Sequence, residues 1–192
     1  MPRLFAGLEI PPDTAERIAV LKQPFPAVRW VAPTDLHITL RFFGDVDKRT
    51  ADLIVDLLAG IEEPMFDAQI AGLSTLGSKD PHAIWADVRP DPALSRLQAG
   101  CERAARQAGL KPETRNFRPH VTLARLGRIN PDYLARILNR RSGFDTAPFP
   151  VARFALFSAR PKVGGGPYVV EETFPLIGGT WDDDEDDFAH VS

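Results

Sequence analysis

The chain has 192 residues, of which 44% are hydrophobic and 26% are charged. This size and composition fit one globular domain or two closely packed lobes, and they exclude a fibrous or wholly disordered chain. The net charge is −3, but the run Asp182–Asp187 contributes six negative charges, so residues 1–181 carry −3 + 6 = +3. This body is mildly basic and lacks the strongly basic stripe that is typical of tight, extended nucleic-acid binding.

The N-terminal residues and the cysteine content indicate a cytoplasmic protein. The apolar run Leu4–Ile10 contains Glu9 and stops at Pro11, so it is too short and too polar for a signal peptide or a membrane span. The single cysteine, Cys101, excludes an internal disulfide framework and favours a reducing compartment. The sequence has no Cys/His cluster with metal-ligand spacing and no glycine motif of a nucleotide-binding loop. We therefore expect no metal, no cofactor and no membrane contact.

The helices and strands are predicted from apolar periodicity and from proline, glycine and capping residues. In chain order we expect strand Leu4–Glu9, a helix from Asp13 to Leu21, strand Leu36–Phe43, a helix that follows Asp47 and includes Leu53–Leu58, strands Phe66–Leu73 and Ala83–Val88, a helix from Pro92 to Ala108, strand His120–Leu126, a helix from Pro131 to Leu138, and strands Phe149–Phe157 and Tyr168–Phe174. Short helices between strands of this kind favour the α+β class.

A tetrapeptide of the form His-x-Thr-Leu occurs twice, at His37–Leu40 and at His120–Leu123. The shift that superposes the two copies also aligns Trp85 with Tyr168, without a gap. We therefore predict a duplicated, two-lobed fold in which two antiparallel-rich sheets face a central cleft about a pseudo-twofold axis, with the helices outside. Residues 1–181 are expected to form this single bilobal domain, and the acidic residues 182–192 are expected to be a disordered tail.

The two histidines are expected to face the cleft from matching positions. Alternate residues of a strand share a face, so His37, Thr39 and Arg41 point to one side of the first strand. His120 and Thr122 form the second copy of this face. A lone histidine or threonine in a strand is usually structural, but the duplication of both at the same spacing favours a functional pair.

The arginines near the two motifs are not equivalent. The counterpart of Arg41 is Ala124, and Arg125 follows one residue later. Arg41 is a candidate phosphate ligand, or a rim residue that pairs with solvent or a carboxylate. Arg125 is a second candidate, but it lies on the opposite face of its strand unless a β-bulge redirects it.

These side chains suit chemistry on a phosphoryl group. Histidine changes its charge near neutral pH, so two imidazoles at one cleft supply both a general base and a general acid. The hydroxyls of Thr39 and Thr122 and the guanidinium of Arg41 are suitable donors to non-bridging phosphate oxygens. The pattern predicts metal-free phosphodiester hydrolysis, and it does not by itself say which histidine is the acid.

Four segments of the chain are similar to a known family: Leu4–Leu8, Leu36–Gly44, Phe117–Arg125 and Gly166–Tyr168. Together they resemble the 2H phosphoesterase superfamily, and specifically the bacterial and archaeal RNA 2′,3′-cyclic phosphodiesterases, also called 2′-5′ RNA ligases. The resemblance implies hydrolysis of a 2′,3′-cyclic phosphate end of RNA to a 2′-phosphomonoester, with His37 as proton donor and His120 as proton acceptor. It also implies an ATP-independent ligation as the reverse reaction.

Two other functions fit the same residues. One is a 2H enzyme that acts on a small cyclic phosphate nucleotide, and the other is a non-catalytic protein that binds RNA ends. The expected partner is RNA with a 2′,3′-cyclic phosphate end or a related cyclic nucleotide, and we expect a monomer. Trp85, Tyr168 and Phe42 are either core aromatics or platforms that stack a terminal base. His82 and His190 lie outside the repeat and are expected to be solvated.

Overall fold

The computed structural model describes residues 1–22, 27–77, 80–139, 143–160 and 165–179. The helices are α1 (Pro12–Ala19), the short 3-10 helix η1 (Pro33–Asp35), α2 (Lys48–Ala59), α3 (Pro92–Gln107) and α4 (Pro131–Asn139). The strands are β1 (Arg3–Glu9), β2 (Val28–Trp30), β3 (His37–Asp45), β4 (Phe66–Ala68), β5 (Ile70–Leu76), β6 (Ala83–Val88), β7 (His120–Leu126), β8 (Phe149–Val151), β9 (Arg153–Ala159) and β10 (Val169–Pro175). The predicted tail, residues 182–192, lies outside the described residues.

The predicted α+β class is confirmed, and the four predicted helices are present. Two predicted strands are each divided in two, at Gln69 between β4 and β5 and at Ala152 between β8 and β9. The division has a physical reason, because β4 and β8 pair with each other while β5 and β9 join the main sheet. Strand β2 was not predicted, since three residues are too few for a periodic signal.

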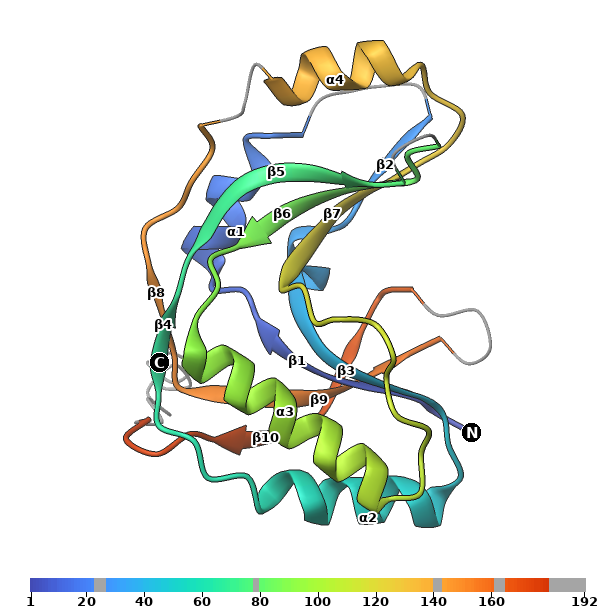
Figure 1. Cartoon of the computed structure of the whole chain (residues 1–192), viewed down its shortest axis with the longest axis vertical. Helices are drawn as coiled ribbons and strands as arrows, with labels where there is room; N and C mark the ends of the chain where they lie inside the picture. Colours follow the sequence, from blue (N-terminus) through green and yellow to red (C-terminus); the bar gives the residue numbers. More distant parts are fainter. Residues whose placement is uncertain (23–26, 78–79, 140–142, 161–164, 180–192) are drawn as a thin grey trace, which may run out of the picture.

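The main sheet has the strand order β10-β9-β1-β3-β7-β6-β5, with β2 paired to β7 (Figure 1). At its centre β3 and β7 are joined through the single residue pair Ile38↔Val121. The sheet is therefore divided at this point into a first lobe that contains β1, β3, β9 and β10 and a second lobe that contains β2, β5, β6 and β7. The two predicted sheets are the two lobes, and they are continuous through this one pair.

Two residue pairs lie on the pseudo-twofold axis. The separation of Ile38 and Val121 along the chain equals the offset of the sequence repeat. The separation of Asp67 and Pro150, at the middle of the β4–β8 pair, equals the same offset. A twofold rotation that superposes one half of the chain on the other therefore keeps both residue pairs in register, as expected for a duplicated chain.

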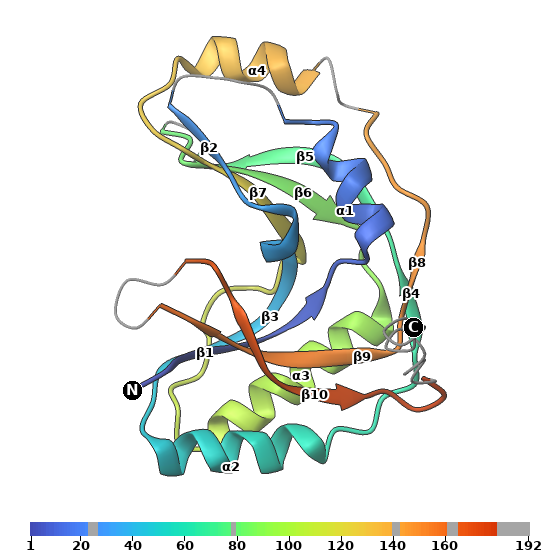
Figure 2. The ribbon, with the colours of Figure 1, turned by 180° about the vertical axis from the view of Figure 1, so that it is seen from behind.

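Each lobe contains one strand from the other half of the sequence. Strand β5 belongs to the first half but pairs with β6, and β9 belongs to the second half but pairs with β1. The chain crosses between the lobes through β4 and β8, which lie side by side at one edge of the molecule (Figures 1 and 2). The exchange makes the two lobes one body and fixes the position of β3 relative to β7.

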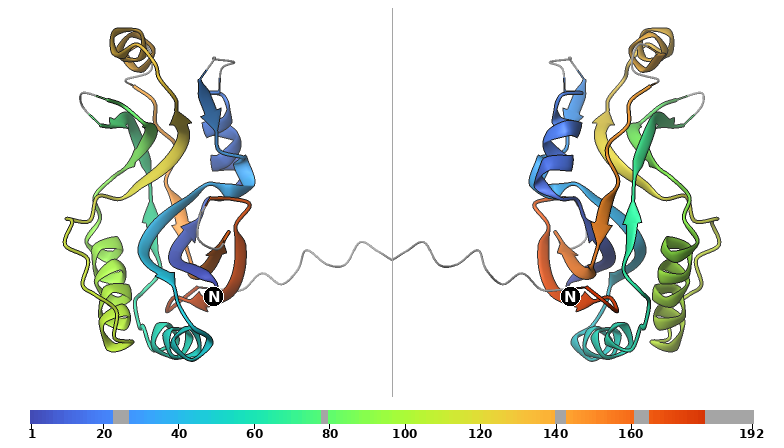
Figure 3. Two further views of the ribbon diagram at one scale, coloured as in Figure 1. Left: turned by 90° about the vertical axis from the view of Figure 1, so that its right-hand side faces the viewer. Right: turned by 90° about the vertical axis from the view of Figure 1, so that its left-hand side faces the viewer.

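The helices flank the sheet outside its central pair. Helix α3 packs on β3 and against α2, and both helices lie beside the first lobe, whereas α4 lies at the far end of the second lobe (Figures 1 and 3). The central strands bury Ile38, Leu40, Val121 and Leu123 in the hydrophobic core. The opposite face of the same strands remains for the polar residues between them.

A β-bulge occurs at the same place in each central strand. The pairing of β3 with β1 skips Leu40, and the pairing of β7 with β6 skips Leu123. A bulge reverses the alternation of faces for the residues that follow it. Arg41 is consequently buried with the core residues, and Arg125 is exposed on the side of the histidines.

Candidate active site

The pair Ile38↔Val121 brings the two His-x-Thr motifs together. Both residues of the pair are fully buried, so the residues on either side of them project from the opposite face of the sheet. Because the two strands run antiparallel, His37 lies toward Thr122 and Thr39 lies toward His120. The four predicted side chains of the repeat therefore meet at the centre of the sheet, and all four are partly accessible.

Both imidazoles are oriented in the same way by their own backbone. The Nδ1 atom of His37 lies 2.8 Å from the carbonyl oxygen of Asp35, and the Nδ1 atom of His120 lies 2.8 Å from that of Arg118. A carbonyl oxygen only accepts, so each Nδ1–H donates this bond. The Nε2 atom of each ring is then the atom that exchanges a proton with a substrate.

His37 lies in an aromatic enclosure on the first lobe. Its ring centre is 4.8 Å from that of Phe5, 4.8 Å from that of Tyr168 in an edge-on arrangement, and 5.9 Å from that of Phe157. Burial among these rings lowers the pKa of His37, because a charged imidazolium is poorly solvated there.

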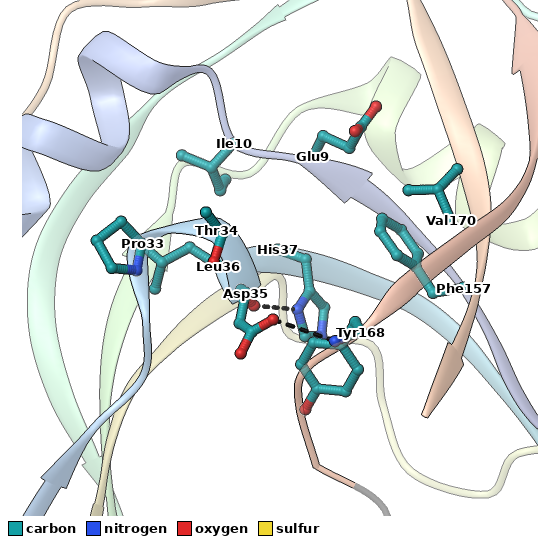
Figure 4. Close-up of a pocket in the computed structure, with 10 residues that line it drawn as sticks. All are labelled: Glu9, Ile10, Pro33, Thr34, Asp35, Leu36, His37, Phe157, Tyr168 and Val170. Atoms are coloured by element: carbon teal, nitrogen blue, oxygen red, sulfur yellow. Dashed lines mark hydrogen bonds between the residues drawn. The ribbon is translucent and has the colours of Figure 1, made fainter. Parts of the chain in front are cut away.

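A pocket of about 110 Å³ opens beside His37 (Figure 4). Glu9 and Asp35 are the carboxylates at its wall, and Phe157 and Tyr168 are its aromatic walls. The side chain of Asp35 accepts a hydrogen bond of 3.1 Å from the backbone N–H of Tyr168, which connects η1 to the start of β10. Asp35 therefore contacts both His37, through its carbonyl, and the residue that encloses His37.

His120 has a different neighbour on the second lobe. Its ring stacks on Trp85, with 3.7 Å between the ring centres and 18° between the planes. The guanidinium of Arg118 lies over the Trp85 ring, 5.8 Å from its centre, and pairs with Asp87 at 2.9 Å. Burial lowers the pKa of His120 as it does that of His37.

The predicted placement of Arg41 on the histidine face is wrong. The bulge at Leu40 turns this side chain to the core side, where its Nε donates to Glu102 of α3 at 2.5 Å. Its two remaining nitrogens donate to the carbonyl oxygens of Phe42 and Lys111. Arg41 is committed to these partners and anchors α3 and the segment after it to β3, so we do not retain it as a phosphate ligand.

Arg125 is placed on the histidine face by the equivalent bulge in β7. Burial raises the pKa of the Tyr168 hydroxyl, and a hydrogen bond and the positive charge of Arg125 act in the opposite direction. The guanidinium therefore lies at the Tyr168 side chain, next to the ring that encloses His37. Arg125 comes from the second lobe and contacts Tyr168, next to the start of β10 in the first lobe, so it links the two lobes.

The remaining candidates are distributed as follows. Trp85 and Tyr168 contact the two histidine rings, whereas Phe42 is 51% exposed with its ring centre 5.3 Å from that of Phe5. His82 is exposed and lies away from the motifs, and His190 lies outside the described residues. Within the described residues, no group of three or more His, Cys, Asp or Glu side chains is arranged to hold a metal ion, and no helix is long and apolar enough to cross a membrane.

Sequence reasoning missed several residues at the site. Phe5 and Phe157 have the pattern of ordinary core positions, and Asp35 and Asp87 belong to no recognisable sequence motif. The position of Arg125 had a signal, because the apolar pattern of β7 changes phase from Val121 and Leu123 to Ala124 and Leu126. Such a change of phase within one strand indicates a bulge.

Comparisons with known proteins agree with this geometry. The family model described as LigT like Phosphoesterase matches two segments, residues 8–85 and 87–168, which correspond to the two halves of the repeat. An RNA 2′,3′-cyclic phosphodiesterase of Aeropyrum pernix is 32% identical over 132 residues, which are 67% of this chain and 75% of that protein. One of Methanothermobacter thermautotrophicus is 29% identical over 85% of this chain and 91% of that protein.

Solved structures show the same fold. The crystal structure of E. coli LigT complexed with 3′-AMP superposes with a TM-score of 0.73 and 25% identity, covering 92% of this chain and 99% of that one. A further phosphoesterase crystal structure superposes with a TM-score of 0.74 and 26% identity, covering 91% of this chain and 98% of that one. On the family match, the repeat and the paired histidines, the chain belongs to the LigT-like family of phosphoesterases.

Proposed function

We propose that this protein hydrolyses the 2′,3′-cyclic phosphate end of RNA to a 2′-phosphomonoester, without a metal ion, by acid/base catalysis at His37 and His120. The observation that carries the proposal is the meeting of two histidines at one pair, Ile38↔Val121, with both Nδ1 atoms bonded to backbone carbonyls. The curated relatives that share most of this chain are named RNA 2′,3′-cyclic phosphodiesterases.

In the proposed reaction, neutral His120 accepts a proton from a water molecule while the water oxygen forms a bond to phosphorus. The bond from phosphorus to the 3′ oxygen breaks, and protonated His37 donates its proton to that oxygen. The products are a 2′-phosphomonoester and a 3′-hydroxyl. If the 5′-hydroxyl of a second RNA replaces the water, the same two proton transfers give a 2′-5′ linkage without ATP.

The charge of the phosphoryl group requires hydrogen-bond donors on the histidine face. We assign this role to the hydroxyls of Thr39 and Thr122 and to the guanidinium of Arg125, because all three lie on that face around the imidazoles. Arg41 has no part in it. The buried thiol of Cys101 fits a reducing compartment, and we infer a cytoplasmic, monomeric enzyme.

The test uses a short RNA with a 2′,3′-cyclic phosphate end, incubated with the purified protein in EDTA. We expect addition of one water and a product with the phosphate on the 2′ oxygen, as determined by mass spectrometry and phosphorus NMR. The variant His37→Ala/His120→Ala, purified in parallel, controls for contaminating nucleases. Dependence of turnover on an added divalent ion would contradict the proposed mechanism.

A mononucleotide is the second candidate substrate. The related E. coli LigT was crystallised with 3′-AMP, and the pocket beside His37 is small. Turnover of 2′,3′-cyclic AMP but not of RNA ends would favour this alternative. Binding of both compounds without turnover of either would instead indicate a non-catalytic protein that recognises RNA ends.

A further inference from the structure

Asp35 and Arg118 occupy the same position in the two halves of the chain. They are separated by the repeat offset, and each lies two residues before its histidine. Each also accepts the Nδ1–H of that histidine on its carbonyl oxygen at 2.8 Å. The backbone of the two halves is thus matched here, while the side chains carry opposite charges.

The other charged residues near the two rings cancel in pairs. In the first lobe Glu9 pairs in register with His37, and its carboxylate bonds Arg153 of β9 at 3.0 Å. In the second lobe Asp87 pairs in register with His120, and its carboxylate bonds Arg118 at 2.9 Å. Each carboxylate opposite a histidine therefore has an arginine partner.

Asp35 is a third carboxylate near the two rings. Its carboxylate bonds the backbone N–H of Tyr168 at 3.1 Å, and a side chain at Gly166 would collide with it. The charged groups that act on His37 are Asp35, which favours the imidazolium, and His120, which disfavours it, whereas at His120 the charge of Asp87 is opposed by that of Arg118. Arg125 and Arg160 act on Tyr168, and Arg29 faces Arg125 across β2 and β7.

We propose that Asp35 is the positioning residue that makes His37 the proton donor of the pair, because it adds one negative charge to the first half of the site while Arg118 neutralises Asp87 in the second half. An imidazolium is stabilised by a nearby negative charge, so the shared proton resides on His37 and leaves His120 neutral. The catalytic consequence rests on the proposed function, whereas the protonation difference does not.

The electrostatics of the two rings support this assignment. Burial is the main cause that lowers the pKa of His37, and the charge of His120 also lowers it, whereas the hydrogen bond to the Asp35 carbonyl and the Asp35 charge raise it. Burial also lowers the pKa of His120, but there the charges of Asp87 and Arg118 act in opposite directions. The charge of Asp35 therefore favours the imidazolium of His37, whereas at His120 the favourable charge of Asp87 is opposed by Arg118.

The test is an NMR titration of the histidine rings in the protein without substrate. In Asp35→Asn the amide oxygen still accepts from Tyr168 but the charge is gone. We expect the pKa of His37 to fall by about 0.5 to 1, a three- to tenfold loss of proton affinity, and that of His120 to change by less than half as much. In Arg118→Gln the pKa of His120 is expected to rise. In the double variant Asp35→Asn/Arg118→Gln, His120 is expected to retain its proton to higher pH than His37.

Asp80→Asn is the matched control, because Asp80 also lies two residues before a histidine but at an exposed position outside the site. It is expected to leave the pKa values of His37 and His120 unchanged, and thermal unfolding checks the fold of every variant. Equal shifts of both rings in Asp35→Asn, or no shift of His37, would overturn the proposal. If Asp35→Asn unfolds, the Arg118→Gln titration still decides, since an unchanged His120 contradicts the charge accounting.

Kinetics with a cyclic phosphate extend the test. Asp35→Asn is expected to lower kcat three- to tenfold at pH 7 with little change in KM, and Asp35→Glu is expected to restore most of it. A wild-type protein that does not hydrolyse the cyclic phosphate would refute the proposed function and leave the titration result in force. Hydrolysis with unchanged titration in Asp35→Asn would refute this proposal alone.

Discussion

The two halves of the active site share a backbone and differ in what surrounds each histidine. Both rings are held at Nδ1 by the carbonyl two residues earlier, and both strands bulge one residue after the threonine. In the first half the ring is enclosed edge-on by Tyr168, and in the second it stacks on Trp85. Duplication therefore fixes where the two histidines lie, and divergence of their neighbours gives them different surroundings.

The largest effects are expected from the histidines, since in the proposed mechanism each supplies one of the two proton transfers. His37→Ala and His120→Ala should each lower kcat by about 10² to 10⁴ with the fold retained. Because the two act in one step, the double variant should be little worse than either single variant. Steady-state rates on a cyclic phosphate substrate check this, and a nearly wild-type rate in one single variant would break the comparison by showing that a single half is sufficient.

The two arginines should separate binding from stability. Arg125→Gln is expected to lower kcat/KM by roughly 10- to 100-fold, the value of about 1.5 to 3 kcal/mol for a hydrogen bond to a charged group, with the thermal midpoint unchanged. Arg41→Gln removes the ion pair with Glu102 of α3 and leaves that carboxylate with Arg106 at 3.8 Å, so it should lower the free energy of unfolding by about 2 to 3 kcal/mol. Urea unfolding and kinetics on both variants measure the two effects. If instead the Arg41 variant lost kcat/KM and the Arg125 variant lost stability, the bulges would not determine which face of the strand each arginine occupies.

The threonines offer a milder comparison between the halves. Thr39→Val and Thr122→Val keep the shape and the strand preference but remove the hydroxyl, so each should lower kcat/KM by roughly tenfold for a cyclic phosphate. Their thermal midpoints should stay close to that of the wild type. Unaltered kinetics in one variant would restrict phosphate binding to the other half.

The smallest effect concerns the position of the pH optimum. Catalysis needs one neutral and one protonated ring, so kcat/KM should be bell-shaped, with limbs that belong to the pair. Burial lowers the pKa of both rings below 6.5, and the fraction with one proton falls once the pH exceeds both values. The maximum is therefore expected on the acid side of pH 6.5. A rate that rises steadily from pH 5 to pH 9 would indicate hydroxide attack without the pair.

Much of this arrangement could be predicted from sequence because the duplication doubles each signal. The constant offset between the two copies located both histidines and threonines, and proline and glycine positions located the helices. Arg41 was assigned to the wrong face because strict alternation was assumed beyond Leu40. The bulge in β3 puts no polar residue where the alternation calls for an apolar one, so the sequence pattern does not reveal the bulge. The enclosure of His37 by Phe5 and Phe157 depends on which strands become neighbours, and single-strand patterns do not contain that information.

The exchange of β5 and β9 between the lobes has a consequence for how the chain folds. Arg3, close to the start of the chain, pairs with Ala159, so the first lobe has no third strand until most of the chain is available. Contacts this distant in sequence slow folding, because a long loop must close before they form. We expect residues 1–80 alone to remain without a stable lobe on the ribosome, so a truncated product would contain a complete histidine motif and no working pair.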